Sequence, residues 1–478
     1  MRDALRWRLV RYGGLAGAAV LAGVAYLGGV LPVWRPGVTP VSIWQGPHGP
    51  VVLLGWLVGT VLLVLAWWAG RHGVPSARWV GVTVGLWLLP LLVAPPLGSR
   101  DVYSYACQGA VYAAGADPYA GGVADAGCRW LAAVSPAWHD TPAPYGPLFI
   151  LVAGAATTLG GSLAGTVALL RLAALLGVAL TAYCLPGLAR HGGVHPDRAL
   201  WLVLACPLVA VHLVSGAHND ALMVGLVVAG LRVVLDRPGR VLPLLAGGAL
   251  LGLAVSVKAT AGVVVPFAML AALPGTYRVR ALVRHGGVVL AGAVAAALLA
   301  TGLAGLGVGW VRGLASSGDS VQWTSPPTAV GLTVDYLGRL FGAHWDAVPV
   351  ARMVGLAVLA LLLVAIWWWA RRGRPLLGAG LALAATVGLA PVFHPWYAVW
   401  PLAVLAVAAV PARWLTVPAT AVSFLALPDG TNLARFTKFP GSLAMTAGLV
   451  VLVIVAVRRL TARPPWSAPP PHSVDPRP

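Results

Sequence analysis

Apolar runs of about 14 to 23 residues recur along the whole chain, separated by short polar links. One helix of about 20 apolar residues crosses the roughly 30 Å hydrocarbon core of a bilayer. The pattern therefore predicts an all-α polytopic membrane protein with about 14 (13–15) transmembrane helices. The runs are 14–33, 51–69, 79–97, 167–188, 199–214, 220–235, 241–256, 259–274, 286–306, 348–370, 376–392, 396–411, 414–427 and 441–457.

A weaker run at 147–163 decides the orientation of everything after it. If this run does not span, 22 of the 32 Lys and Arg residues lie in predicted cytoplasmic segments. If it spans, the count falls to 13 inside against 19 outside. Because short cytoplasmic loops are enriched in Lys and Arg, we predict that 147–163 is a re-entrant or interfacial helix.

This topology places both termini in the cytoplasm of a multi-pass plasma-membrane protein. Residues 1–13 form the N-terminus, 14–457 a single transmembrane domain, and 458–478 a Pro-rich cytoplasmic tail that we expect to be disordered. The loops 98–146 and 307–347 fall on the outer side. We expect the first of them to carry an extracytoplasmic active site.

Composition excludes a soluble protein. Hydrophobic residues make up 59% of the chain and charged residues 9%, far below the roughly 25% of soluble domains. The net charge of +19 comes from short basic clusters between apolar runs, where it suits anionic lipid headgroups, so we expect the bilayer and no nucleic acid as partner. Glu is absent and Lys occurs only at Lys258 and Lys438.

The scarce carboxylates gather in the first outer loop. Four of the thirteen acidic residues, all Asp, lie there: Asp101, Asp117, Asp125 and Asp140. Asp101 follows the third apolar run directly, where its carboxylate can face a space open to water and lipid. A carboxylate in that position can accept the proton of a sugar hydroxyl, as a general base does. The alternatives are a solvated loop residue and a partner for the adjacent Arg100.

Four basic side chains at the same face are candidates for binding a donor phosphate: Lys258, His218, His394 and Arg171. Lys258 interrupts an apolar stretch at the outer end of a predicted helical hairpin, so it either snorkels or neutralises an anion. His218 opens a helix together with Asn219 and Asp220, which also fits helix capping. Arg171 lies within a predicted span, where it either snorkels outward or faces the same anion.

A further group of side chains suits stacking on and hydrogen bonding to a sugar or acceptor. Interfacial Tyr and Trp also anchor membrane helices without any ligand, so both interpretations stay open. The candidates are Tyr103, Tyr105, Gln108, Asn219, Asp220, Trp396 and Tyr397.

Two further patterns bear on cofactors and compartment. No HExxH or paired CxxC pattern and no Gly-rich nucleotide loop occurs, so we expect no metal, no cofactor and no soluble nucleotide-sugar donor. Cys107 and Cys128 share the outer loop, where the sequence is compatible with a disulfide and with two free thiols.

The order of five short motifs resembles the actinobacterial polyprenol-phosphomannose-dependent α-1,6-mannosyltransferases, GT-C enzymes that elongate the mannan core of lipomannan in the cell envelope. The motifs are Asp101-Val102-Tyr103-Ser104-Tyr105, Gly115-Ala116-Asp117-Pro118-Tyr119, Thr141-Pro142-Ala143-Pro144-Tyr145-Gly146-Pro147, Gly216-Ala217-His218-Asn219-Asp220 and His394-Pro395-Trp396-Tyr397. The resemblance covers about residues 95–450. GT-C enzymes usually carry the catalytic Asp after their first helix, as part of an acidic pair. Here it follows the third apolar run, beside Arg100.

This resemblance implies an inverting glycosyltransferase. The donor would be polyprenyl phosphomannose and the acceptor a growing α-1,6-mannan lipoglycan, with Asp101 as base on the outer side. Lys258, His218 and His394 would stabilise the departing phosphate as cations. A transporter or flippase of lipid-linked sugar is the alternative. It needs polar residues near the bilayer midplane, whereas these residues are predicted at the outer edge.

The topology is testable by labelling. A single Cys introduced near Gly121, in a background without native Cys, should react with an impermeant maleimide in intact cells, because the loop is predicted to lie outside. Labelling that appears only after lysis would reverse the topology.

Overall fold

The computed structural model describes residues 2–33, 39–316 and 320–461. Within these ranges the chain is helical and contains no extended strand, and one isolated β-bridge joins Ala426 and Asn432. Each of the fourteen predicted apolar runs contains helical structure, and several runs, such as 79–97 and 396–411, extend beyond the end of their helix. The all-α prediction is therefore confirmed. The predicted disordered tail falls mostly on 462–478, outside the described residues.

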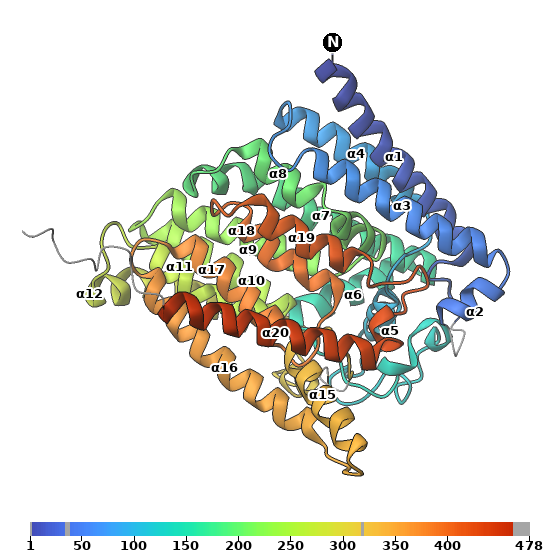
Figure 1. Ribbon diagram of the computed structural model, residues 1–478. Helices are drawn as coiled ribbons and strands as arrows, with labels where there is room; N and C mark the ends of the chain where they lie inside the picture. The colour runs from blue at the N-terminus through green and yellow to red at the C-terminus, as the bar shows by residue number, and fades with distance from the viewer. Residues whose placement is uncertain (1, 34–38, 317–319, 462–478) are drawn as a thin grey trace, which may run out of the picture.

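Most of the helices follow one another with short connections, whereas the long segment 114–146 joins α5 to α6 (Figure 1). Short 3₁₀ or π turns, among them η3 (Val209–Ser215), η4 (Ala259–Val264) and η6 (Pro395–Ala398), interrupt them. The helices are α1 (Arg2–Gly28), α2 (Pro40–Gln45), α3 (Gly49–Ala69), α4 (Ala77–Val93), α5 (Asp101–Ala113), α6 (Pro147–Gly160), α7 (Leu163–His191), α8 (Pro196–Leu204), α9 (Asp220–Asp236), α10 (Val241–Val257), α11 (Val265–Ala271), α12 (Val279–Ala281), α13 (Gly287–Ala304), α14 (Trp310–Ser316), α15 (Pro326–Leu340), α16 (Ala347–Ala370), α17 (Pro375–Leu389), α18 (Val399–Leu405), α19 (Ala412–Ser423) and α20 (Lys438–Thr461).

Length and hydropathy qualify six of the described helical segments as membrane spans, or seven if α8 and η3, bent by 66°, form one. The six lie in α1, α3, α7, the α12–α13 segment, α16 and α20. Further apolar helices are shorter, including α4, α10 and α17. This is a polytopic membrane protein, and the count of fourteen spans stays a prediction.

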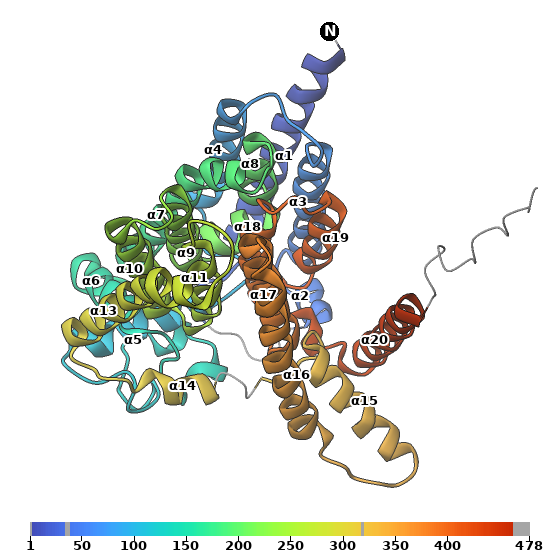
Figure 2. The same cartoon turned by 90° about the vertical axis from the view of Figure 1, so that its left-hand side faces the viewer.

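The ends of the helices gather on two opposite sides in Figure 1. The start of α1 lies at the top and α12 and the end of α20 lie at the left, whereas α2 lies at the right and α5 and α15 lie toward the lower right. Figure 2 shows α15, α16 and α20 extending away from the body that contains α7, α9 and α10. The start of α1 and the end of α20, which the sequence places on one side of the membrane, are thus on the opposite side of the molecule from α2 and α5, and the orientation itself stays a prediction.

The two segments expected to be outer loops contain helices. Residues 98–146 begin with α5, most of whose side chains are buried, and 307–347 contain α14 and α15. The α6 helix has 14 residues, about 21 Å at 1.5 Å per residue, which is shorter than the hydrocarbon core. The α17 helix, which lies in a predicted span, has only 15 residues, so length does not separate the two helices and the non-spanning α6 stays a prediction.

A disulfide joins Cys107 of α5 to Cys128, so the structure contains the bond that the sequence left open. It ties the polar segment after α5 back onto the helix that begins at Asp101.

The core of the body is built by close helix packing. At Gly177 of α7, an added Cβ would meet the backbone carbonyl of Ala221 in α9. Gly230 of α9 and Gly247 of α10 approach each other in the same way. Small residues let membrane helices come together closely. As a result, the N-terminal end of α9 lies beside the C-terminal end of α10.

Candidate functional site

Two cavities meet at Asp101. The first has a volume of about 430 Å³ and the second about 670 Å³, both within the usual range for ligand sites. Three residues, Asp101, Trp138 and His394, line both cavities. A single carboxylate is therefore accessible from two sides.

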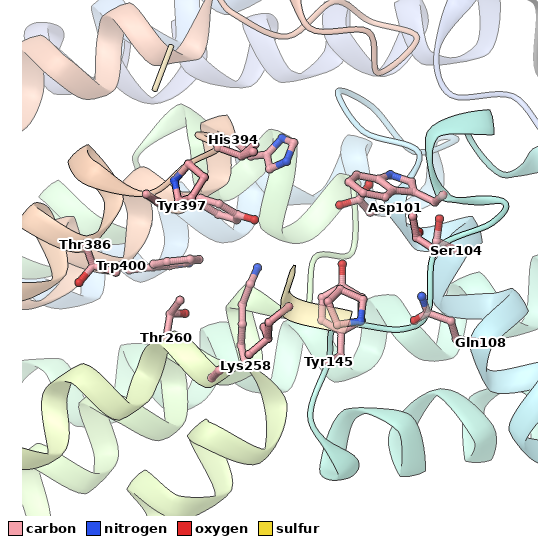
Figure 3. Close-up of a pocket in the computed structure, with 18 of the residues that line it drawn as sticks. Asp101, Ser104, Gln108, Tyr145, Lys258, Thr260, Thr386, His394, Tyr397 and Trp400 are labelled. Atoms are coloured by element: carbon pink, nitrogen blue, oxygen red, sulfur yellow. The ribbon is translucent and has the colours of Figure 1, made fainter. Parts of the chain in front are cut away.

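The first cavity gathers residues from distant parts of the chain (Figure 3). Asp101, Ser104 and Gln108 come from one face of α5, and Lys258 and Thr260 come from the α10–η4 junction. The other lining residues are Trp138, Thr141, Pro144, Tyr145, Ala259, Leu314, Leu356, Thr386, Ala390, Pro391, Val392, His394, Tyr397 and Trp400. Oxygens of Ser104, Gln108 and Thr260 have no hydrogen-bond partner among the residues that the structure describes, which leaves them available to hydroxyl groups of a ligand.

Asp101 is the first residue of α5 and is only 8% exposed. Its backbone N–H donates to Oγ of Ser99 at 3.2 Å. Burial raises the pKa of its carboxyl from 3.8 to about 6, against a lowering by the charge of Lys258. A carboxyl with that pKa is mostly ionised at neutral pH and is a stronger base than a solvated Asp.

Lys258 caps the end of α10 and is 9% exposed. Its Nζ lies 2.9 Å from Oδ1 of Asp220, the first residue of α9. The same oxygen accepts a hydrogen bond of 2.6 Å from Nε1 of Trp400. The sequence left two interpretations of Lys258, snorkelling and neutralisation of an anion. Its contact with Asp220 favours the second, and the carboxylate of Asp220 is one such anion.

Two histidines stack with Trp396 beside Asp101. The ring centroid of Trp396 lies 4.7 Å from that of His394 and 3.9 Å from that of His218. Nδ1 of His218 is 3.2 Å from the hydroxyl of Tyr105 and 3.9 Å from Oδ2 of Asp101. The stack forms one side of the approach to the carboxylate.

The two imidazoles are not cations at neutral pH. Burial lowers the pKa of His394 to about 3, and the charge of Lys258 acts in the same direction. Burial also lowers the pKa of His218 well below its usual value. The expectation that both stabilise a phosphate as cations finds no support here. A neutral imidazole can still donate one hydrogen bond.

The second cavity is more polar. Nδ2 of Asn432 donates to Oε1 of Gln322 at 2.8 Å, and Arg435 and Lys438 also line this space. Trp138 and Trp396 also line it, and the ring of Trp396 is stacked against His218 and His394. Amides, cations and an aromatic surface are the groups that bind carbohydrate hydroxyls and ring faces.

Six of the twelve residues proposed from the sequence line a cavity: Asp101, Gln108, Lys258, His394, Trp396 and Tyr397. The other six, which line neither cavity, are His218, Arg171, Tyr103, Tyr105, Asn219 and Asp220.

The contacts of these six give several of them other roles. Arg171 donates to the carbonyls of Leu92, Ala94 and Ser215 at 2.6, 3.1 and 2.8 Å. It therefore holds the end of α4 against η3. The hydroxyl of Tyr103 donates to the carbonyl of Val30. Tyr105 packs edge-on against Tyr145 and Phe149.

Capping does not explain the Asn219-Asp220 pair. Asn219 stands at the N-cap of α9 without a side-chain capping hydrogen bond, and its side-chain N and O atoms find no hydrogen-bond partner in the described part of the chain. Asp220 is fully buried and binds Lys258 and Trp400.

The sequence interpretation missed several lining residues. Trp138, which lines both cavities, is one of 21 Trp residues, and nothing in its local sequence marks it. Gln322 and Asn432 are 110 positions apart, and only the fold shows that they are neighbours. No group of three or more His, Cys, Asp or Glu side chains in the described ranges is arranged to hold a metal.

Comparison with known proteins assigns almost the whole chain. Residues 11–274 match the family described as "Alpha-(1->6)-mannopyranosyltransferase, N-terminal domain", and 327–458 match "MptB C-terminal domain". The chain is 38% identical to alpha-(1->6)-mannopyranosyltransferase A of Mycobacterium tuberculosis, over 82% of this chain and 76% of that protein.

Two further relatives match over nearly the full length. A probable alpha-(1->6)-mannopyranosyltransferase of Mycolicibacterium smegmatis is 32% identical over 97% of this chain and 90% of its own. Alpha-(1->6)-mannopyranosyltransferase B of Corynebacterium glutamicum is 30% identical over 96% of this chain and 83% of its own.

Proposed function

This chain belongs to the alpha-(1->6)-mannopyranosyltransferase family and is a mannosyltransferase. On that premise we propose that it transfers mannose from polyprenyl phosphomannose to a growing α-1,6-mannan lipoglycan at the outer face of the plasma membrane. The proposal includes a GT-C arrangement of about fourteen spans and cytoplasmic termini.

One observation carries the proposal: the Asp101 carboxylate lies where two cavities meet. Glycosyl transfer brings an activated sugar and a separate hydroxyl nucleophile to one reaction centre. Two spaces that converge on one base suit a donor and an acceptor that approach from opposite sides. A transporter needs a single path that opens alternately, and the enzyme family sets that alternative aside.

The first cavity suits the donor. Lys258 is its cationic side chain and matches a phosphodiester, while Leu314, Leu356 and Val392 give part of its wall an apolar character suited to a lipid-linked ligand. Ser104 and Gln108 lie on the Asp101 side of the cavity, across it from Lys258 (Figure 3), where they can bind the hydroxyls of the transferred sugar.

The second cavity suits the acceptor. Gln322 and Asn432 present amides, and Trp138 adds an aromatic side chain to the wall. An acceptor bound there would extend its terminal hydroxyl toward Asp101. Because this cavity is larger than the first, about 670 against 430 Å³, it has room for part of a polymer that must move along by one sugar after each transfer.

The reaction is a single displacement with inversion. The acceptor oxygen attacks the anomeric carbon of mannose, the bond from that carbon to the phosphate oxygen breaks, and polyprenyl phosphate leaves with the bonding electrons. Asp101 takes the proton of the acceptor hydroxyl. Charge on the phosphate increases as it leaves, so Lys258 stabilises the transition state more than the bound donor. We include no metal or cofactor in the mechanism.

Asp101→Asn should leave the protein folded while lowering transfer by about 10² to 10⁴-fold, the usual range for a general base. Asn keeps the size of Asp but cannot accept the proton. The measurement is transfer of radiolabelled mannose from polyprenyl phosphomannose to membranes containing the protein.

Asp117→Asn, Asp125→Asn and Asp140→Asn are the matched controls, since all three lie in the same segment outside both cavities. Near-normal turnover in Asp101→Asn together with loss in a control would reassign the base. Normal turnover in all four would argue against the transfer mechanism itself.

The dependence on pH follows from the pKa of about 6 at Asp101. The base must be deprotonated to act, so kcat/KM should be constant above pH 7 and fall below pH 6. At pH 5 about a tenth of the base form remains, and the loss should be about tenfold. A profile that stays flat down to pH 5 would contradict the assignment.

Lys258→Met keeps the length of the side chain and removes its charge. It should lower kcat/KM for the lipid donor on the order of 10² to 10³-fold, as loss of an electrostatic stabiliser does, and leave the KM of the acceptor unchanged. Steady-state kinetics with each substrate varied in turn test this. Unchanged donor kinetics in a folded variant would show that Lys258 does not bind the phosphate.

A further inference from the structure

Asp220 is an unusual residue for this protein because it is a fully buried carboxylate that lines neither cavity. It stands in the first turn of α9, where the helix dipole favours a negative charge. Its Oδ1 accepts from Lys258 at 2.9 Å and from Trp400 at 2.6 Å. These contacts direct Asp220 to the back of Lys258, away from a ligand in the cavity.

Lys258 is enclosed on its other sides by aromatic rings. Its Nζ lies 4.5 Å from the ring centroid of Tyr397, 5.0 Å from that of Trp400 and 5.9 Å from that of Tyr145. Figure 3 shows the amino group pointing into the space between Tyr397 and Tyr145, with Asp101 across the cavity. A free Lys side chain has many rotamers, and this enclosure selects one of them.

Stability alone is a weak reason for this arrangement. Desolvation of a buried ion pair often outweighs the attraction between its charges, and well-packed apolar residues in its place are often as stable. A charged Lys side chain in the wall of a cavity is useful where that cavity receives an anionic ligand. The buried carboxylate behind it then has a function: it keeps the ammonium charged and in place while the cavity holds no anion.

We propose that Asp220 is a positioning residue that holds the Lys258 ammonium, through Oδ1 and with the indole N–H of Trp400, at the place where the phosphate of a lipid-linked donor binds. This inference rests on the proposed function. It replaces the expectation that Asp220 contacts the sugar, because Asp220 acts only through Lys258. Trp400 is part of the same device, since its hydrogen bond orients the carboxylate.

The test is a double-mutant cycle of wild type, Asp220→Asn, Lys258→Met and the double variant, with kcat and both KM values measured by transfer from polyprenyl phosphomannose. Asp220→Asn should lower kcat on the order of 10- to 100-fold, the range found for outer partners that orient a metal ligand. The KM of the acceptor should stay constant, which a general loss of structure would not produce.

The decisive comparison is between Lys258→Met and the double variant. If Asp220 acts through Lys258, removing its charge when Lys258 is already Met should change kcat less than about twofold, because neighbours that act as one unit are not additive. This comparison does not need the single Asp220→Asn variant to fold, since the double variant contains neither buried charge.

Trp400→Phe is the milder companion, because it keeps a ring near Lys258 and removes only the N–H that donates to Asp220. It should lower kcat less than Asp220→Asn does, and its effect should disappear when residue 220 is Asn. A further loss from Asp220→Asn in the Lys258→Met background would show that Asp220 acts on its own and would overturn the inference. Faster turnover in Asp220→Asn would overturn it as well.

The proposed function can fail separately. If Lys258→Met alone leaves donor kinetics normal, the donor site is misplaced. If Lys258→Met is impaired and the loss of kcat in the double variant is the product of the losses in the two single variants, the donor site stands and only the role of Asp220 is rejected.

Discussion

The high free energy of a charge removed from water is the constraint on which this structure depends. In a membrane interior a charged side chain needs a partner, and a buried polar group needs a hydrogen bond. Arg171 meets this requirement with three backbone carbonyls, and Lys258 meets it with Asp220. Asp101 is the exception. The charge of Lys258 offsets only part of the effect of burial, so the pKa of Asp101 rises to about 6. The same desolvation that disfavours this charge makes the carboxylate a useful base.

Helix packing turns that constraint into a site. Gly177, Gly230 and Gly247 let α7, α9 and α10 approach closely, which brings Asp220 and Lys258 together although 38 positions separate them. The disulfide from Cys107 ties down the segment after α5, and this segment supplies Trp138 to both cavities. The site is therefore built from the closely packed helices α7, α9 and α10 together with the disulfide-tied segment after α5.

The sequence was most informative where a residue type was rare. Asp101, the first Asp after a long apolar stretch, and Lys258, one of two Lys residues, stood out, and both line the first cavity. The helices followed from the apolar runs because burial in a bilayer leaves few other choices for the backbone. Arg171 was misleading, because a sequence shows a cation inside a span but not the carbonyls that it meets. Gln322 and Asn432 were missed, since the amide pair exists only after distant segments pack.

The central claim is that donor and acceptor occupy different cavities and meet at residue 101. The most direct measurement is an electron cryomicroscopy structure of Asp101→Asn bound to polyprenyl phosphomannose and a short α-1,6-mannoside. The phosphate should contact Lys258 in the first cavity, the mannoside should lie along Gln322 and Asn432, and its attacking hydroxyl should be about 2.6–3.2 Å from the side chain at 101. A mannoside bound in the first cavity, or an anomeric carbon remote from residue 101, would contradict the mechanism.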